Sequence, residues 1–177
     1  MTARHKSEHM THLDGNTLVK KDHPRIRFRG MLDRVEAEIL VCQYHCVQGG
    51  HVQLTMELQE MLEFVRGLIP CEVLGKPVGE IILCGYTADQ LREHSHRPQE
   101  YYGQPHFMPC VTDDSAVLYV NRLRTVVRQA ELAGYEAFKN YDGTVKRPDI
   151  MLAMNRLSSL CWIMMIKLKA GKYERKG

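Results

Sequence analysis

Apolar residues recur with a helical period over four long stretches of the chain. The clearest stretch runs from Ser115 to Ala133; it contains no glycine or proline and carries its apolar residues on one side of a 3.6-residue wheel. With its flanks it predicts a helix over about 113–138. Similar spacing predicts helices over 24–47, from 51 to about 69, and over 148–169. After Pro70, residues 71–74 either add a turn to the second helix or belong to the following connection. No strand-like alternation is convincing, so the pattern predicts an all-α protein.

The connections between these helices predict a bundle. Short connections, at the glycines 49–50 and at the turn 142–143, are typical of antiparallel neighbours. Between the second and third long helices, a capping box at 87–90 predicts a brief helix to about residue 94. Residues 95–112 are irregular and contain three prolines; a loop of this length either contacts a ligand or serves as a structural crossover. We expect a four- or five-helix up-down bundle with one long crossover loop.

Composition sets the domain organisation and excludes several classes of protein. A chain of 177 residues is most simply one domain, which we place at 23–170, after a polar, flexible or partly ordered N-terminal arm (1–22) and before a basic tail (171–177). The net charge of +3 is mild, and no dense Lys/Arg tract suggests nucleic acid. No apolar run approaches the roughly 20 residues of a membrane span, and no secretory signal is visible.

The six cysteines are scattered, as is typical of reduced intracellular thiols. Two of them, Cys42 and Cys46, lie four residues apart on the apolar side of the first helix, next to His45. Together the three side chains could hold a metal, or the two thiols could simply pack into the core. Classical nucleotide-binding loops, paired Glu-x-x-His motifs and Cys-x-x-Cys motifs are absent from the sequence.

A polar stripe follows the edge of the apolar face in the third long helix. Asn121, Arg124, Arg128 and Glu131 succeed one another by three or four residues, so they lie on one side of the helix, half-buried. Buried guanidinium groups require carboxylate or phosphate partners. The stripe therefore predicts either a polyphosphate ligand or an internal ion-pair network that includes Asp33 from the first helix.

Longer matches carry a family resemblance from about residue 11 to residue 169. The chain resembles the cob(I)alamin adenosyltransferases, above all those of ethanolamine-utilisation operons, and more loosely the propanediol-utilisation type. The matching stretches are THL at 11–13, DHPRIRFRGMLD at 22–33, LGKPVG at 74–79, LREHSHRP at 91–98, LRTVVRQAE at 123–131 and RPDIMLAMNRLSS at 147–159. The propanediol-type pattern Arg-x-x-x-Arg-x-x-Glu is met at 124–131, and Asn-Arg-Leu-Ser at 155–158.

The resemblance implies transfer of the 5′-deoxyadenosyl group of ATP to Co(I) of cobalamin or another corrinoid, in a homotrimer of helix bundles that binds both substrates between subunits. It also implies a salt bridge between Asp33 and Arg124 across the subunit interface. Apolar side chains under the corrin ring would remove the lower axial ligand, and Phe107 is the candidate by position, unless it only anchors its loop. The expected ATP contacts are Arg128, Asn155, Glu131, Lys20 and Lys21, and the weaker corrinoid candidates are His106, Tyr101, Tyr102 and Trp162.

Two departures from the family pattern affect the phosphates and the metal. Residues 11–17 replace the Lys-Thr-Gly-Asp-x-Gly loop that holds triphosphate in the propanediol type, so we expect Arg128, a lysine at 20 or 21 and Mg²⁺ to serve instead. The His and Cys-Cys-x-x-Cys cluster usual upstream in the ethanolamine type is absent from this sequence, so no metal role is carried over from it.

The resemblance also implies a cytoplasmic setting, beside a bacterial microcompartment, with a corrinoid reductase and the ethanolamine ammonia-lyase system as partners. The alternative is a non-catalytic corrinoid-binding or structural helix bundle of the same system.

Overall fold

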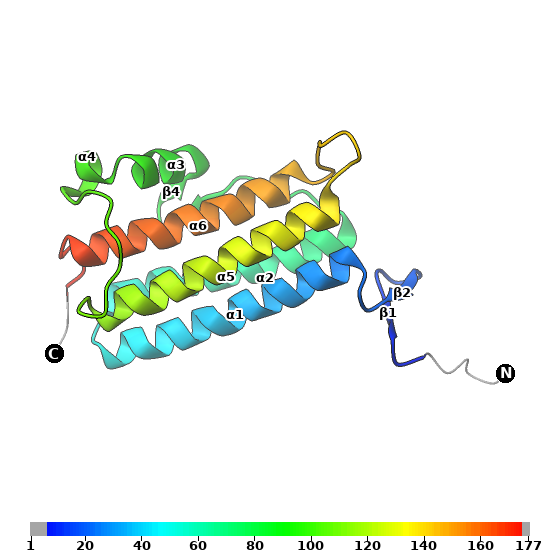
Figure 1. Ribbon diagram of the computed structural model, residues 1–177, viewed down its shortest axis with the longest axis horizontal. Helices are drawn as coiled ribbons and strands as arrows, with labels where there is room; N and C mark the ends of the chain where they lie inside the picture. The colour runs from blue at the N-terminus through cyan, green and yellow to red at the C-terminus, as the bar shows by residue number, and fades with distance from the viewer. Residues whose placement is uncertain (1–6, 175–177) are drawn as a thin grey trace.

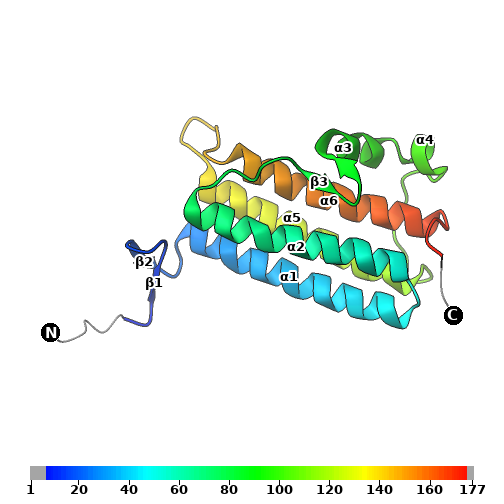
Figure 2. The same ribbon diagram turned by 180° about the vertical axis from the view of Figure 1, so that it is seen from behind.

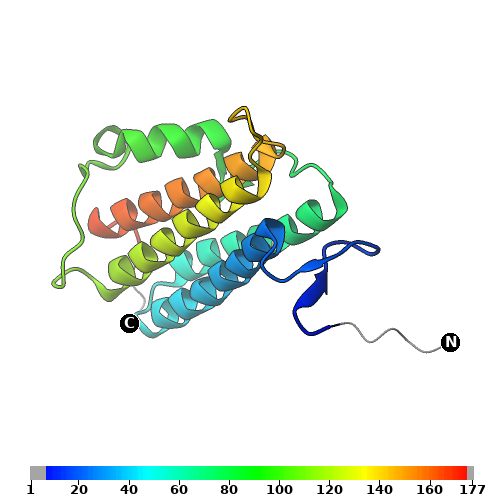
Figure 3. The ribbon, with the colours of Figure 1, turned by 45° about the vertical axis from the view of Figure 1, so that its right-hand side comes forward.

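The computed structural model describes residues 7–174 and confirms the all-α architecture (Figure 1). Each long helix lies antiparallel to its two neighbours in a closed ring, in which α1 packs on α2 and α5, and α6 packs on α5 and α2 (Figures 1 and 2). The chain crosses over between α2 and α5, where the short helices α3 and α4 pack on α6 (Figure 3). The helices are α1 (Pro24–Gln48), α2 (Val52–Leu74), α3 (Ala88–His96), α4 (Pro98–Tyr102), α5 (Ser115–Phe138) and α6 (Pro148–Lys169).

The helix ends follow local chemistry. Prolines occupy the first turn of α1 and α6, where a backbone N–H would have no intrahelical partner. The bounds of both helices agree with the prediction to within one residue. The Asp114 side chain accepts a hydrogen bond from the backbone N–H of Ala116 at 2.8 Å and caps α5, so this helix begins two residues later than predicted.

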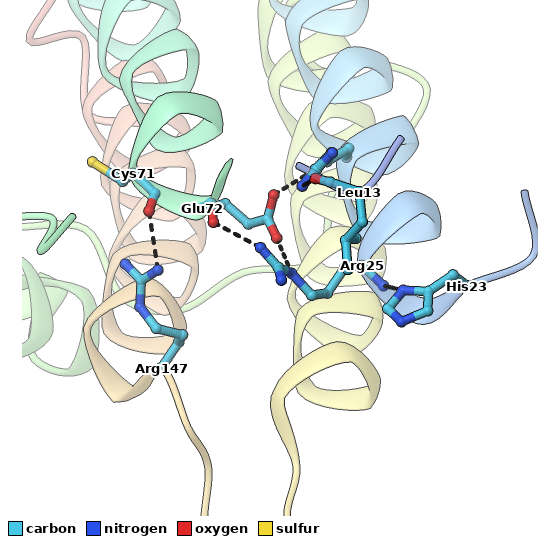
Figure 4. A network of polar contacts seen from close by, with 7 residues as sticks. Leu13, His23, Arg25, Cys71, Glu72 and Arg147 are labelled. Atoms are coloured by element: carbon cyan, nitrogen blue, oxygen red, sulfur yellow. Dashed lines mark hydrogen bonds and ion pairs between the residues drawn. The ribbon is translucent and has the colours of Figure 1, made fainter. Parts of the chain in front are cut away.

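Helix α2 continues past Pro70, so of the two alternatives for residues 71–74 the structure has the added turn. A proline removes one helical hydrogen bond, but the last turn persists to Gly75, which has the left-handed φ of 66° common at helix ends. This last turn is held from outside the helix. Glu72, which is 1% exposed, forms ion pairs with Arg25 and Arg29 of α1 (Figure 4).

Two small hairpins were not predicted. Strand β1 (Met10–His12) pairs with β2 (Leu18–Lys20), and β3 (Ile82–Leu83) pairs with β4 (Tyr86–Thr87). Strands of two or three residues are too short to show a period of two. The first hairpin occupies the predicted N-terminal arm, and the carbonyl of Leu13 in its loop accepts a hydrogen bond from Arg29. Residues 1–6 of the arm and 175–177 of the tail lie outside the described residues.

The core fills the space between the four long helices. Its members include Phe28 and Leu32 of α1, and Phe28 packs 3.1 Å from where a side chain would begin on Gly134 of α5. A larger residue at 134 would have to displace the ring, which explains a glycine inside that helix.

Within residues 7–174, α6 is the one helix long and apolar enough to cross a membrane, but 61% of its most apolar window is buried in the bundle, as in a core helix.

Candidate functional site: an arginine-lined groove

The conspicuous polar residues of α5 and α6 face a common groove. One hollow of about 480 Å³ lies between these helices and the crossover loop, and its lining includes Arg124, Arg128, Asn155 and Trp162. A second hollow, of about 360 Å³, includes Glu131. Because Arg128, Asn155 and Ser158 line both hollows, the two form one continuous depression, which we call the arginine groove.

Helical spacing explains why these side chains meet. Arg124 and Arg128 are one turn apart on α5, and Asn155, Ser158 and Trp162 follow one another by three or four residues on α6. The two helices pack side by side (Figure 1), and residues of both polar seams line the same hollows. The predicted ATP contacts Arg128, Asn155 and Glu131 are therefore brought together.

Among residues 7–174, neither arginine has a carboxylate partner. Arg124 is half-buried, donates to Asn121 Oδ1 at 3.3 and 3.2 Å, and stands 5.6 Å from the Trp162 ring centroid. Arg128 is exposed and makes no hydrogen bond or ion pair with any residue of the described chain. Burial lowers the pKa of Arg124, and the charge of Arg128 lowers this pKa further. Two uncompensated cations at the edge of a groove favour an anionic ligand.

The internal ion-pair network is not formed. Asp33 is exposed on α1 and pairs with neither arginine inside residues 7–174, and Glu131 accepts a hydrogen bond from Asn155 Nδ2 at 3.1 Å instead. Of the two interpretations of the stripe, the ion-pair network is not formed within residues 7–174, and the anionic ligand stays a prediction. The salt bridge between Asp33 and Arg124 across subunits stays a prediction.

Aromatic side chains form one wall of the groove. Phe107 and His106 both stack on Trp162, with ring centroids 5.4 and 5.7 Å apart, and the three rings line the same hollow. Phe107 is partly buried, and Lys169 Nζ lies 5.4 Å from its ring centroid. The crossover loop therefore contributes lining residues to the groove, and Phe107 both anchors this loop and borders the hollow.

Other candidates lie elsewhere. Tyr102 is drawn into a cluster outside the groove, with its hydroxyl 2.8 Å from His94 Nδ1 and 3.2 Å from the Tyr86 hydroxyl, and burial raises its pKa. Tyr101 stacks on His94 at 3.7 Å. Lys20 and its neighbour Lys21 are exposed at the end of β2, on the side of the bundle away from α4 (Figure 1). Within a single chain these lysines do not reach the groove.

The metal candidates of α1 do not assemble. Cys42 and Cys46 are buried in the core, while His45 stacks on Tyr119 at 3.6 Å. A hydrogen bond with Cys46, followed by burial, raises the pKa of Cys42, which keeps this thiol protonated. Among residues 7–174 no group of three His, Cys, Asp or Glu side chains is placed to hold a metal ion. The thiols behave as core residues.

Sequence reasoning missed Arg156. This residue is 7% exposed, and its Nη1 donates to Asn155 Oδ1 at 2.5 Å. A signal was present in the helical pattern, because position 156 lies on the same face of α6 as Ala153 and Leu160, both of which are buried. An arginine on an apolar face marks either an unusual core contact or a role at the adjacent site.

Comparisons with known proteins identify the family of the chain. A family model described as cobalamin adenosyltransferase matches residues 1–168. The curated corrinoid adenosyltransferases EutT of Escherichia coli K12 and Salmonella typhimurium LT2 are 32% and 30% identical to the chain over 165 residues, which is 91% of this chain. The match covers 59% of the length of these relatives. No solved structure gave a significant match.

Proposed function

Because the chain belongs to the cobalamin adenosyltransferase family, whose members use ATP and a corrinoid, we propose that it transfers the 5′-deoxyadenosyl group of ATP to Co(I) of a corrinoid and releases triphosphate. The observation that carries the proposal is the arginine groove. Its lining combines two arginines that have no carboxylate partner among residues 7–174 with the stacked rings of Phe107, His106 and Trp162, which suits a polyphosphate beside a large, flat, largely apolar macrocycle.

The proposed reaction needs no nucleophile from the protein. The electron pair of Co(I) forms the Co–C5′ bond, the C5′–O bond breaks, and triphosphate leaves with the bonding pair of that C5′–O bond. The protein contributes orientation, which holds cobalt in line with C5′, and positive charge where the leaving group becomes more negative. Arg128 suits the second task because no group of the described chain occupies its guanidinium. Asn155 and Glu131 then bind other parts of the nucleotide.

Phe107 is placed for the cobalt half of the reaction. Its ring borders the hollow and is backed by Trp162, so it presents a fixed apolar surface toward a bound macrocycle. An apolar surface against one face of the corrin ring excludes water and other axial ligands from cobalt. Without a lower axial ligand, Co(II) is easier to reduce to the nucleophilic Co(I). The reaction still needs an electron donor for this reduction, so a corrinoid reductase is the partner that it requires.

Mg²⁺ enters the proposal with the nucleotide. It is usually held by substrate phosphates and one or two carboxylates, and Glu131 is the carboxylate in the lining of the groove. Among the described residues no group of three His, Cys, Asp or Glu side chains is placed to hold a resident metal ion. The proposed mechanism therefore assigns no residue to such an ion.

Several surface features favour a site shared between subunits. Leu132 and Tyr135 at the rim of the groove are 68% and 39% exposed, and apolar side chains of this size are commonly covered in an oligomer. Lys20 and Lys21 line neither hollow of the groove in their own chain, and in the proposed trimer a neighbouring copy supplies them to the triphosphate. The proposed trimer would also bring Asp33 of one copy to Arg124 of the next.

The oligomer is tested by its mass in solution. We expect light scattering after size exclusion to give three times the chain mass of 20.4 kDa. Asp33→Arg should lower this mass, because two cations would face each other across the interface. A wild-type monomer would contradict the shared site.

The activity is tested by incubating the protein with ATP and chemically reduced cobalamin. We expect the Co(I) absorbance to give way to that of adenosylcobalamin, with one triphosphate released per turnover. Absence of product, together with failure to bind ATP or cobalamin, would refute the proposal. Because the chain spans only 59% of its curated relatives, a corrinoid-binding bundle without turnover is the second candidate. Binding of cobalamin without product would favour it.

A further inference from the structure

Arg156 is a buried cation that the fold does not compensate. Its side chain has five N–H donors, but it makes one hydrogen bond in the structure, and its buried Nε meets no acceptor. No carboxylate of residues 7–174 forms an ion pair with it. A buried guanidinium without an anion costs stability, so packing does not explain its presence.

The surroundings of Arg156 add to this cost. Burial lowers its pKa, and the positive charge of Arg92 on α3 lowers this pKa further. The opposing charges of Asp89 and Glu131 act only from beyond ion-pair distance. A methionine of similar length would avoid both the cost of burying a charge and the repulsion from Arg92. Replacing buried charged groups by apolar residues of similar volume is often neutral or stabilising. Within residues 7–174, the hydrogen bond that Arg156 makes is to Asn155.

That contact determines which way the Asn155 amide points. Arg156 Nη1 donates to Asn155 Oδ1 at 2.5 Å, and Asn155 Nδ2 donates to Glu131 Oε1 at 3.1 Å. If the amide were flipped, its NH₂ would face the guanidinium and its carbonyl oxygen would face the carboxylate, so both hydrogen bonds would be lost. The two neighbours therefore present the amide N–H groups, and not the carbonyl, on the Glu131 side, where Asn155 lines both hollows.

We propose that Arg156 is a positioning residue, which holds the Asn155 amide so that it donates a hydrogen bond to an acceptor atom of the bound nucleotide. This inference rests on the proposed function, because it takes ATP as the ligand of the groove. The buried cation lowers stability, and its benefit is a preorganised donor that need not reorient when the nucleotide binds.

The test compares ATP affinity with stability in the full chain. In Arg156→Met we expect the dissociation constant for ATP, from titration calorimetry, to rise about tenfold, the effect of one misdirected hydrogen bond. The melting temperature should stay the same or rise. Arg156→Lys keeps one donor and should retain part of the affinity. Arg92→Met is the matched control, since it removes a nearby arginine that does not contact Asn155, and its ATP affinity should equal that of the wild type.

A double-mutant cycle separates positioning from a structural role. If Arg156 acts through Asn155, the double variant Asn155→Ala/Arg156→Met should bind ATP no more weakly than Asn155→Ala alone. Wild-type affinity in Arg156→Met, additive losses in the cycle, or a melting temperature lowered by more than about 5 °C in both Arg156 variants would each overturn the inference. A wild-type protein that fails to bind ATP would instead refute the proposed function, so the two failures are distinguishable.

Discussion

Replacing Arg128 with alanine is expected to reduce the rate of adenosylation by about 100- to 1000-fold, the usual cost of removing one preorganised group that stabilises charge in a transition state. The physical reason is that Arg128 is the exposed cation of the groove, with no partner in the described chain to neutralise it. For the same reason, the helix content and the melting temperature should not change. Turnover with saturating ATP and reduced cobalamin, together with circular dichroism, measures both outcomes.

Arg122 provides a matched control on the same helix. It lies outside the groove and donates to Glu38 of α1 at 2.8 Å, in an ion pair whose arginine side is mostly exposed to water. Arg122→Ala should therefore keep full activity and lose little stability. Equal loss of activity in both variants would show that the positive charge of α5 acts as a general field and not through a contact. Unfolding of Arg128→Ala would assign this arginine a structural role.

The periodic parts of this protein were predictable because they depend on local pattern. Helix α6 begins at Pro148 and ends at Lys169 as the apolar spacing predicts. The meeting of Arg128 with Asn155 follows from two predicted helices once they pack side by side. Helical spacing alone places a side chain on a face, so the α5 and α6 halves of the groove could be anticipated from the sequence and the resemblance together.

The parts that were missed depend on contacts between distant segments. Glu72 sustains the turn of α2 beyond Pro70 through partners 43 and 47 residues away, which no local rule takes into account. Tyr102 was grouped with Phe107 because the two lie close in sequence, yet α4 turns Tyr102 toward His94. Arg156 was passed over because helical periodicity treats each residue as apolar or polar and does not ask whether a buried charge has a partner.

Glu72 also gives the largest expected effect on stability. Its fully buried carboxylate is shared by Arg25 and Arg29, and Arg25 Nη2 additionally donates to the Glu72 carbonyl at 2.9 Å (Figure 4). Glu72→Gln keeps the shape but removes the charge, and so leaves two partly buried guanidinium groups uncompensated. Breaking a buried pair in this way costs about 3–5 kcal/mol, which for a domain of this size lowers the melting temperature by about 10 °C.

The position of Glu72 in the chain predicts where the damage appears first. Arg29 also donates to the carbonyl of Leu13, so the same cluster ties the N-terminal hairpin to the bundle, and limited proteolysis should cut Glu72→Gln earlier within 7–22 than the wild type. Glu36→Gln is the control, because its partner Arg66 is half-exposed and the pair should contribute less than about 1 kcal/mol. If both variants melt within 2 °C of the wild type, the buried cluster does not hold the end of α2, and another contact must carry that turn past Pro70.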